Sequence, residues 1–210
     1  KTLYSGSFYD RFVLGKWCAS EGLVYPFMSD EKMICDVPDG DAEEYVISCD
    51  YGTVNPASFG LWGRFGDEWY RIREYYYSSR REGTSRTDEE HYEGLCELAG
   101  NHEIQKIVVD PSAASFIEVI KRHGKYHVIP AKNNVLDGIR QTSTALKEGR
   151  IRICKSCTDA VNEFGMYRWE SSGKDAPLKE NDHAMDDIRY FVTTVLNAEE
   201  DNFYVFASDR

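Results

Sequence analysis

Four ionisable groups lie within six consecutive residues, Asp182 to Asp187, at the start of the last predicted helix. Apolar residues recur there at helical spacing, from Ala184 through Ile188 to Val195, which predicts a buried stripe. The opposite face of that helix gathers polar side chains three and four positions apart: His183, Asp186, Asp187 and Tyr190. Taken alone, this pattern also fits a solvated helix with an acidic first turn, which the helix dipole favours.

Two further acidic residues follow apolar stretches that have the character of strands. Asp50 comes directly after residues 45–49, and Asp110 comes directly after residues 104–109. Where strands alternate with helices, binding sites form at the carboxyl ends of the strands. We therefore expect Asp50 and Asp110 to be neighbours, with the acids of the last helix beside them. Helix geometry alone does not choose between Asp186 and Asp187.

Carboxylates gathered in this way repel one another, so they either keep a proton or bind hard cations. Oxygen ligands favour Mg²⁺ or Mn²⁺ over softer metals. Two such ions can activate a water molecule and stabilise the leaving oxygen of a phosphodiester. His183 could be an outer ligand or could orient the water. An aspartate at a strand end is often only a turn former, so the combination, not either residue alone, indicates a site.

The order of elements predicts an α/β fold whose mixed sheet has helices on its faces. The expected strands are residues 45–49, 57–62, 69–77, 104–109, 127–129 and 151–153, and the first three form an antiparallel meander. The expected helices are residues 87–99, 113–123 and 135–147 and the last helix, with a capping box at Thr87 and Glu90. Residues 159–169 fit either a helix or a strand.

Composition shifts divide the chain into three parts. Residues 1–40 have the character of a linker or the end of an upstream domain, docked by aromatic side chains. Residues 41–197 form the compact domain, and residues 198–210 form a polar tail. Residues 164–179 carry Gly and Pro around aromatic residues, which fits either a mobile flap or a rigid hairpin.

The 210 residues include 41% hydrophobic ones, a composition that excludes a disordered chain. No apolar run approaches the length of a membrane span, and no signal-peptide pattern is present. The six Cys residues are scattered, as reduced thiols are. The Cys154-x-x-Cys157 spacing could indicate zinc or redox chemistry, but without a second pair at finger spacing it fits incidental cysteines better.

The formal charge of −11 argues against strong, free-standing DNA binding, which needs cations to displace counterions. It does not exclude a nuclease, because metal-binding carboxylates contribute to that charge and a tethered partner can hold DNA in place.

Three motifs together resemble the large terminase subunits of tailed bacteriophages. Residues 47–56, which include Asp50-Tyr51-Gly52, resemble the first catalytic strand of that family. Residues 108–114, with Asp110-Pro111-Ser112, resemble its second acidic strand. Residues 181–190 are similar to its closing motif, in which His183 and Asp186 have the family's His-x-x-Asp spacing. Lesser matches lie in residues 15–25 and 138–151, so the resemblance covers nearly the whole chain.

The resemblance implies a C-terminal nuclease domain with a ribonuclease H-like fold. By this resemblance, Asp50, Asp110 and Asp186 of this chain would hold two Mg²⁺ or Mn²⁺ ions, with His183 assisting. Asp187 and Asp182 would support these ligands or have a structural role, so replacing Asp187 should reduce activity less than replacing Asp186. The implied activity is endonucleolytic cutting of concatemeric double-stranded phage DNA during genome packaging, in the cytoplasm of the infected bacterial host.

The partners implied are an upstream ATPase domain of the same polypeptide, the portal protein and the small terminase subunit. No GxxxxGK[ST] loop occurs in these residues, so we expect no ATPase activity from them and no membrane partner. Two basic groups could contact DNA phosphates without reading sequence, although a solvated basic face is the other interpretation. Their members are Arg71, Arg73, Arg80, Arg81, Lys121, Arg122 and Lys132.

Two alternatives remain open from the sequence. Another ribonuclease H-like enzyme, such as a junction resolvase or transposase core, would prefer branched or end-bearing DNA over plain duplex. A non-catalytic docking module would bind the portal or another protein through the aromatic N-terminal residues. Plasmid nicking with Mn²⁺ that survives Asp50→Ala would show that the site assignment is wrong.

Overall fold

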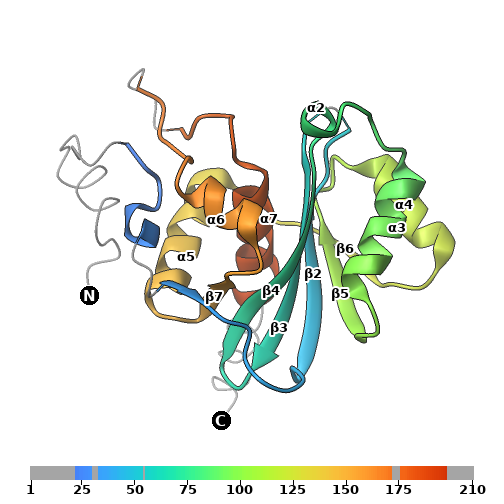
Figure 1. Ribbon diagram of the computed structural model, residues 1–210, viewed down its shortest axis with the longest axis horizontal. Coiled ribbons are helices and arrows are strands. Elements are labelled where there is room, and N and C mark those ends of the chain that lie inside the picture. Colours follow the sequence, from blue (N-terminus) through green and yellow to red (C-terminus); the bar gives the residue numbers. More distant parts are fainter. Residues whose placement is uncertain (1–21, 30–32, 54, 172–175, 198–210) are drawn as a thin grey trace, which may run out of the picture.

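Seven strands form one mixed sheet in the computed structural model, which describes residues 22–29, 33–53, 55–171 and 176–197 (Figure 1). The spatial order is β1-β7-β4-β3-β2-β5-β6. The strands are β1 (Ile34–Cys35), β2 (Glu44–Asp50), β3 (Ala57–Phe65), β4 (Glu68–Tyr77), β5 (Ile104–Val109), β6 (Val128–Pro130) and β7 (Ile151–Cys154). Only β3 runs against the others, which confirms the predicted meander flanked by parallel strands.

Helices cover both faces of the sheet, as predicted (Figure 1). One face carries α3 (Asp88–Ala99) and α4 (Ala114–His123), and the other carries α5 (Val135–Lys147), α6 (Thr158–Phe164) and α7 (His183–Phe191). The short helix α2 (Ser79–Glu82) follows the end of β4. Successive side chains along a strand point to opposite faces of the sheet. Val46 and Trp62 therefore belong to the core under α5–α7, whereas Ile47 and Leu61 belong to the core under α3 and α4.

Several helix ends match the sequence signals that predicted them. Thr87 and Glu90 form the expected capping box at the start of α3, so two backbone N–H groups that lack helical partners are satisfied. Gly124 ends α4 at a φ of 67°, in the left-handed region that glycine adopts without a steric penalty.

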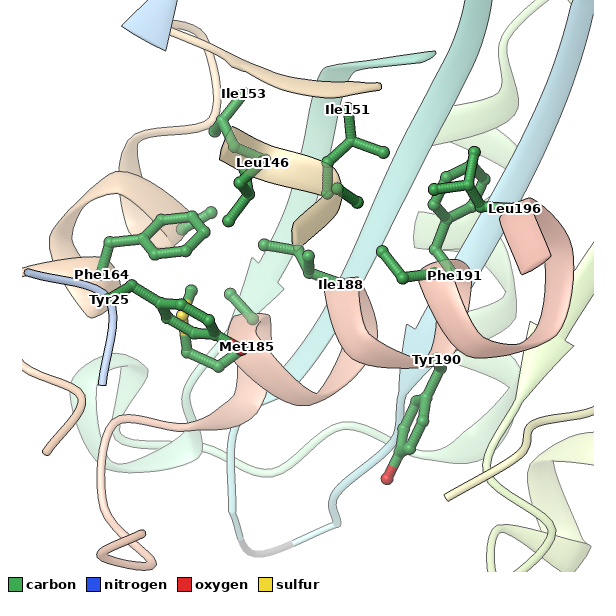
Figure 2. Close-up of a cluster of buried hydrophobic side chains, with 14 of the residues drawn as sticks. Tyr25, Leu146, Ile151, Ile153, Phe164, Met185, Ile188, Tyr190, Phe191 and Leu196 are labelled. Carbon is green, nitrogen blue, oxygen red and sulfur yellow. The ribbon is translucent and has the colours of Figure 1, made fainter. Parts of the chain in front are cut away.

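The last helix is anchored along its whole length. Met185, Ile188 and Phe191 point into a cluster that also contains Leu146 from α5 and Ile151 from β7 (Figure 2). The ring of Phe191 stacks on Trp62 of β3 with centroids 4.0 Å apart. Burial of each large apolar side chain contributes about 1.5–3 kcal/mol. The helix is therefore held firmly against the sheet, and it continues as a π-helical turn, η3 (Val192–Leu196).

The residues that the sequence placed in a linker take part in the fold from residue 22 onward. Tyr25, next to the 3₁₀ turn η1 (Pro26–Ser29), is buried against Phe164, with ring centroids 5.5 Å apart, so an aromatic side chain does dock this segment. The two-residue strand β1 pairs with β7 at the sheet edge, which was not predicted because two residues carry no periodicity. Residues 1–21 and the tail at 198–210 lie outside the described residues.

The segment at 164–179 has the character of a hairpin where it is described. Trp169 bridges Pro177, and the Leu178 N–H donates to the Arg168 carbonyl at 2.8 Å. Leu23 bridges Arg168, which ties the segment to the N-terminal residues. In the described part of the chain, no helix combines the length and the apolar character that a membrane span requires.

Candidate active site

Asp50 and Asp110 emerge from neighbouring strands at the same edge of the sheet. Asp50 ends β2, and Asp110 directly follows β5. These strands are parallel, with Cys49 paired to Val109, so the two aspartates occupy adjacent positions in the register. Both residues therefore lie at the carboxyl ends of adjacent strands, as their positions after apolar runs predict.

A polar cavity of about 220 Å³ opens beside the end of β2. Its walls come from β2, the loop after it, the segment that leads into α7 and the first turn of α7. The lining residues are Asp50, Tyr51, Gly52, Asn55, Lys179, Asp182, His183 and Asp186. The structure thus brings together three of the four predicted ligands, Asp50, His183 and Asp186. Asp110 is not among the residues that line this cavity.

Asp50 and His183 are joined directly. The imidazole Nδ1 donates to Asp50 Oδ2 at 2.9 Å, which leaves Asp50 Oδ1 and the imidazole Nε2 to face other groups. Burial raises the pKa of Asp50 to about 6; the hydrogen bond from His183 opposes this rise and the charge of Asp186 adds to it. Burial alone would lower the pKa of His183, but the hydrogen bond and charge of Asp50 raise it.

Asp110 is held one residue beyond its strand by two donors. The Ser112 N–H donates to Oδ1 at 2.7 Å, and the Tyr190 hydroxyl from α7 donates to Oδ2 at 2.7 Å. Burial would raise the pKa of Asp110, but these hydrogen bonds and the charge of Arg189 hold it below its ordinary value. Asp110 is therefore a carboxylate at neutral pH, linked to α7 through Tyr190.

Asp186 faces the cavity and also pairs with an arginine one turn later. Arg189 Nη2 lies 2.8 Å from Asp186 Oδ1, and the Arg189 side chain is only 2% exposed. Arg189 Nε and Nη1 are buried without a hydrogen-bond partner among the described residues. This guanidinium is thus a buried positive charge beside the acidic cavity. The spacing of Asp186 and Arg189 was visible in the sequence, but the burial of the arginine was not.

Asp187 is separated from the cavity, and its surroundings correct the expectation that α7 has a single polar face. It is fully buried between α7 and the sheet, where it accepts hydrogen bonds from Arg71, Ser58 and Ser48. The predicted polar face of α7 is therefore split, with Asp186 on the cavity side and Asp187 on the sheet side. Burial raises the pKa of Asp187 to about 7, against the opposing effect of the Arg71 charge.

Arg71 cannot contact DNA, contrary to the expectation from sequence. Its side chain is 0% exposed and forms an ion pair with Asp187. Burial disfavours its charged form, but the carboxylate of Asp187 outweighs that effect and raises its pKa. A β-bulge at Ile72 lies beside it, where Leu61 pairs with Arg73 and Trp62 pairs with Arg71.

The other basic residues named from the sequence are exposed, and the cavity wall includes none of them. Arg80 and Arg81 lie in α2, directly after the carboxyl end of β4, and Arg81 pairs with Asp159. Lys132 follows β6. Lys121 and Arg122 lie in the last turn of α4, and Arg73 lies on β4. Arg122 pairs with Glu89 and Lys121 pairs with Glu118.

One acidic residue beside the site had no sequence signal. Glu163 of α6 is 2% exposed, and its Oε2 accepts the Ala184 N–H at 2.7 Å. Its other oxygen accepts the Tyr76 hydroxyl of β4 at 2.7 Å. Within a seven-residue helix of mixed composition, nothing in the sequence distinguishes this glutamate from a solvated one.

The donors at this edge fit a hard divalent cation in kind. Asp50, Asp110 and Asp186 supply carboxylate oxygens and His183 supplies an imidazole nitrogen, a set suited to Mg²⁺ or Mn²⁺. Among the described residues, however, no three His, Cys, Asp or Glu side chains stand close enough together to form a complete ligand set. The described part of the chain therefore gives Cys154 and Cys157 no zinc site either, and their thiols donate to the backbone carbonyls of Asp36 and Arg71.

Comparison with known proteins relates the chain to phage large terminases. A large terminase from a thermophilic bacteriophage, solved in complex with ADP, is 43% identical with a TM-score of 0.82 over 92% of this chain and 50% of that one. The large terminase subunit of Escherichia phage T5 is 23% identical over 165 residues, 75% of this chain and 36% of that protein. No family model matches the sequence.

The fold is also that of a separately solved nuclease. The large terminase nuclease from thermophilic phage G20c, solved with bound magnesium, superposes with a TM-score of 0.60 at 12% identity, covering 83% of this chain and 98% of that one. The chain spans only half the length of the ADP-bound large terminase and about a third of the T5 protein. The chain is thus a relative of phage terminase large subunits, and it has the ribonuclease H-like fold of their nuclease domains.

Proposed function

We propose that the chain is a divalent-metal-dependent DNA endonuclease that cuts concatemeric double-stranded phage DNA during genome packaging. The observation that carries this proposal is the convergence of Asp50, His183 and Asp186 on one cavity, from segments 133 residues apart along the chain. The 43% identity to a large terminase supports the packaging role. The cavity lies where ligands bind in sheets of this kind, outside the carboxyl ends of the strands.

Asp50, Asp110 and Asp186 are the residues we assign to holding two Mg²⁺ or Mn²⁺ ions, with His183 assisting. When bound, such ions lower the pKa of a water molecule and neutralise charge on the phosphodiester. The bound magnesium of the G20c nuclease supports this choice of metal. Asp182 and Asp187 would support the ligands without binding the metal. Asp182 lies in the cavity wall, and Asp187 is buried between α7 and the sheet.

The chain's own residues would orient and hold protons around the scissile phosphate. His183 donates through Nδ1 to Asp50, which fixes the imidazole and directs its Nε2 away from that carboxylate. Tyr190 holds the Asp110 carboxylate toward α7. Arg189, buried beside Asp186, keeps positive charge at the edge of an acidic cavity. Preorganisation of this kind stabilises charge without rearrangement during the reaction.

DNA would reach the site with little help from sequence-specific contacts. Arg80 and Arg81 follow β4 and Lys132 follows β6, so these three residues lie at the carboxyl edge of the sheet and would contact phosphates. Arg73, Lys121 and Arg122 would be weaker contacts, because Arg73 lies within β4 and the other two lie in the last turn of α4, so none of them follows the carboxyl end of a strand. Low sequence specificity and a strong dependence of affinity on salt follow from contacts limited to the backbone.

The remaining components of packaging are proposed on the likeness to longer terminases. An ATPase domain in the same polypeptide would supply the motor, and the large terminase that is 43% identical to this chain was solved with ADP. The portal protein and small terminase subunit would be further partners, and the site of action would be the cytoplasm of the infected bacterium. These 210 residues would themselves cut DNA without hydrolysing ATP.

Nicking of a supercoiled plasmid in Mn²⁺ tests the proposal. The wild-type chain should nick the plasmid, EDTA should stop the reaction, and Asp50→Ala should abolish it. Arg64→Ala is a matched control, because Arg64 pairs with Glu43 and Glu44 at the far end of the β2–β3 pair. Undiminished nicking by Asp50→Ala would show that the site is elsewhere. A strong preference for branched DNA over plain duplex would favour a resolvase.

A further inference from the structure

The first turn of α7 is capped by a residue from another helix. Asp182 occupies the N-cap position of α7, but its side chain makes no capping hydrogen bond. Its backbone has φ −120° and ψ 0°, whereas capping side chains need an extended backbone. The preceding residue, Asn181, has a φ of 52°, so the chain enters the helix from the left-handed region. The Asp182 carboxylate lines the acidic cavity instead.

Glu163 provides the missing cap. Its Oε2 accepts the Ala184 N–H at 2.7 Å, while Oε1 accepts the hydroxyl proton of Tyr76 at 2.7 Å. Tyr76 belongs to β4, so one carboxylate ties α6, the start of α7 and the sheet together. At 2% exposure, a carboxylate is tolerated only because both of its oxygens are hydrogen-bonded.

The residues of this turn are the ones the site depends on. His183 is the first residue of α7, and Asp186 lies less than one turn further on. Ala184, whose N–H Glu163 holds, lies between them. Side chains that position metal ligands commonly change metal affinity by about 10–100-fold when they are removed.

We propose that Glu163 is a positioning residue, which fixes the first turn of α7 so that His183 and Asp186 face Asp50. The inference rests on the proposed function, because it assigns metal binding to that cavity. Glu163 itself does not touch the reacting groups. The reach of its side chain, and not its charge, is what the geometry requires.

Three substitutions at this position separate reach from charge. Glu163→Ala removes both hydrogen bonds. Glu163→Gln keeps an oxygen for the Ala184 N–H, and its NH₂ can donate to the Tyr76 hydroxyl, which can accept. Glu163→Asp keeps the charge but is one methylene too short. The Kd of the 210-residue chain for Mn²⁺, measured by calorimetry, should rise about 10–100-fold in the Ala and Asp variants and stay within about threefold of wild type in the Gln variant.

A second readout follows the turn itself. Exchange of the Ala184 amide hydrogen should become faster in Glu163→Ala and return toward the wild-type rate in Glu163→Gln, because this amide loses and then regains its acceptor. Thr87→Ala is the matched control, since it removes the equivalent cap from α3, which lies on the other face of the sheet. It should lower Tm and leave the Kd for Mn²⁺ unchanged.

The outcomes distinguish this inference from the proposed function. If Asp50→Asn weakens Mn²⁺ binding and Glu163→Ala does not, only the role of Glu163 is overturned. The same conclusion follows if Thr87→Ala weakens binding as much as Glu163→Ala, because destabilisation alone would then explain the loss. If neither Asp50→Asn nor Glu163→Ala changes Mn²⁺ binding, the metal site itself is wrong and both proposals fall.

Discussion

Asp186 and Asp187 are neighbours on α7 with opposite surroundings. Asp186 faces the cavity that Asp50 and His183 also line, whereas Asp187 is buried against the sheet, where it forms an ion pair with Arg71. Successive helical residues point about 100° apart, which is enough to place one on the pocket side and the other on the sheet side. The difference shows how one turn of helix can supply both a chemical group and the anchor that fixes its position.

The anchor is a small buried network of polar side chains around Asp187. Arg71 and Asp187 form its ion pair, while Ser48 and Ser58 donate to the same carboxylate. The Trp62 indole N–H donates to Ser48 at 2.9 Å, which links the network to the ring that stacks on Phe191. The register of α7 on the sheet is thus fixed by directional bonds as well as by apolar packing.

Breaking the anchor should have the largest effect on stability. Asp187→Ala leaves Glu74, 3.4 Å away, as the remaining carboxylate partner of the buried Arg71, so the free energy of unfolding should fall by about 3 kcal/mol in urea denaturation. The double variant Arg71→Met with Asp187→Leu removes both charges and should recover part of that loss. A stability of Asp187→Ala equal to wild type would show that the pair does not anchor α7.

The reverse pattern is expected for activity. Asp186→Asn should reduce Mn²⁺-dependent nicking by at least about 100-fold, because it removes an assigned ligand. Asp187→Asn, assayed per folded molecule, should retain activity within about fivefold of wild type, since Asp187 does not reach the cavity. Equal losses in the two variants would contradict the division of roles between these neighbours.

Titration of Asp50 should contribute to the dependence of stability on pH. Asp50 has a pKa of about 6 in the folded chain, above an unfolded value of about 3.9. The folded chain therefore binds the proton more tightly, and this contribution to stability is present below about pH 4 and lost as the pH rises through about 6. It amounts to at most about 3 kcal/mol.

Urea denaturation in EDTA at several pH values checks this. Asp50→Asn should be less sensitive to pH between about 4 and 6 than the wild-type chain. Asp187 and His183, whose pKa values are also raised, act with the same sign, so some dependence on pH should persist in Asp50→Asn. An unchanged slope in Asp50→Asn would show that Asp50 is not the group responsible.

A smaller effect should come from the space around the anchor. A Cβ at Gly60 would collide with the guanidinium of Arg71, so Gly60→Ala should cost about 1–3 kcal/mol of unfolding free energy. Gly165→Ala is the matched control, because its Cβ would meet only the Asn162 carbonyl oxygen at 3.4 Å. Thermal denaturation of the two variants should differ clearly, and similar Tm values would show that Arg71 can move aside.

Local sequence signals predicted the elements of this fold but not its buried charges. Asp50 and Asp110 could be placed at strand ends because apolar runs stop at them, and the last helix followed from its apolar stripe. Arg71 could not be predicted as buried, because its partner Asp187 lies 116 residues away and an arginine in a strand normally faces solvent. Glu163 was missed for the same reason, since its partners belong to β4 and α7.

Acids from β2, the end of β5 and α7 are assigned here to the same divalent ions. A crystal structure with Mn²⁺, using anomalous differences to locate the metal, tests that assignment. We expect manganese bound by carboxylate oxygens of Asp50, Asp110 and Asp186 at about 2.0–2.3 Å, with Asp187 still paired with Arg71. Manganese bound away from Asp50 and Asp110, or bound by Asp187, would contradict it.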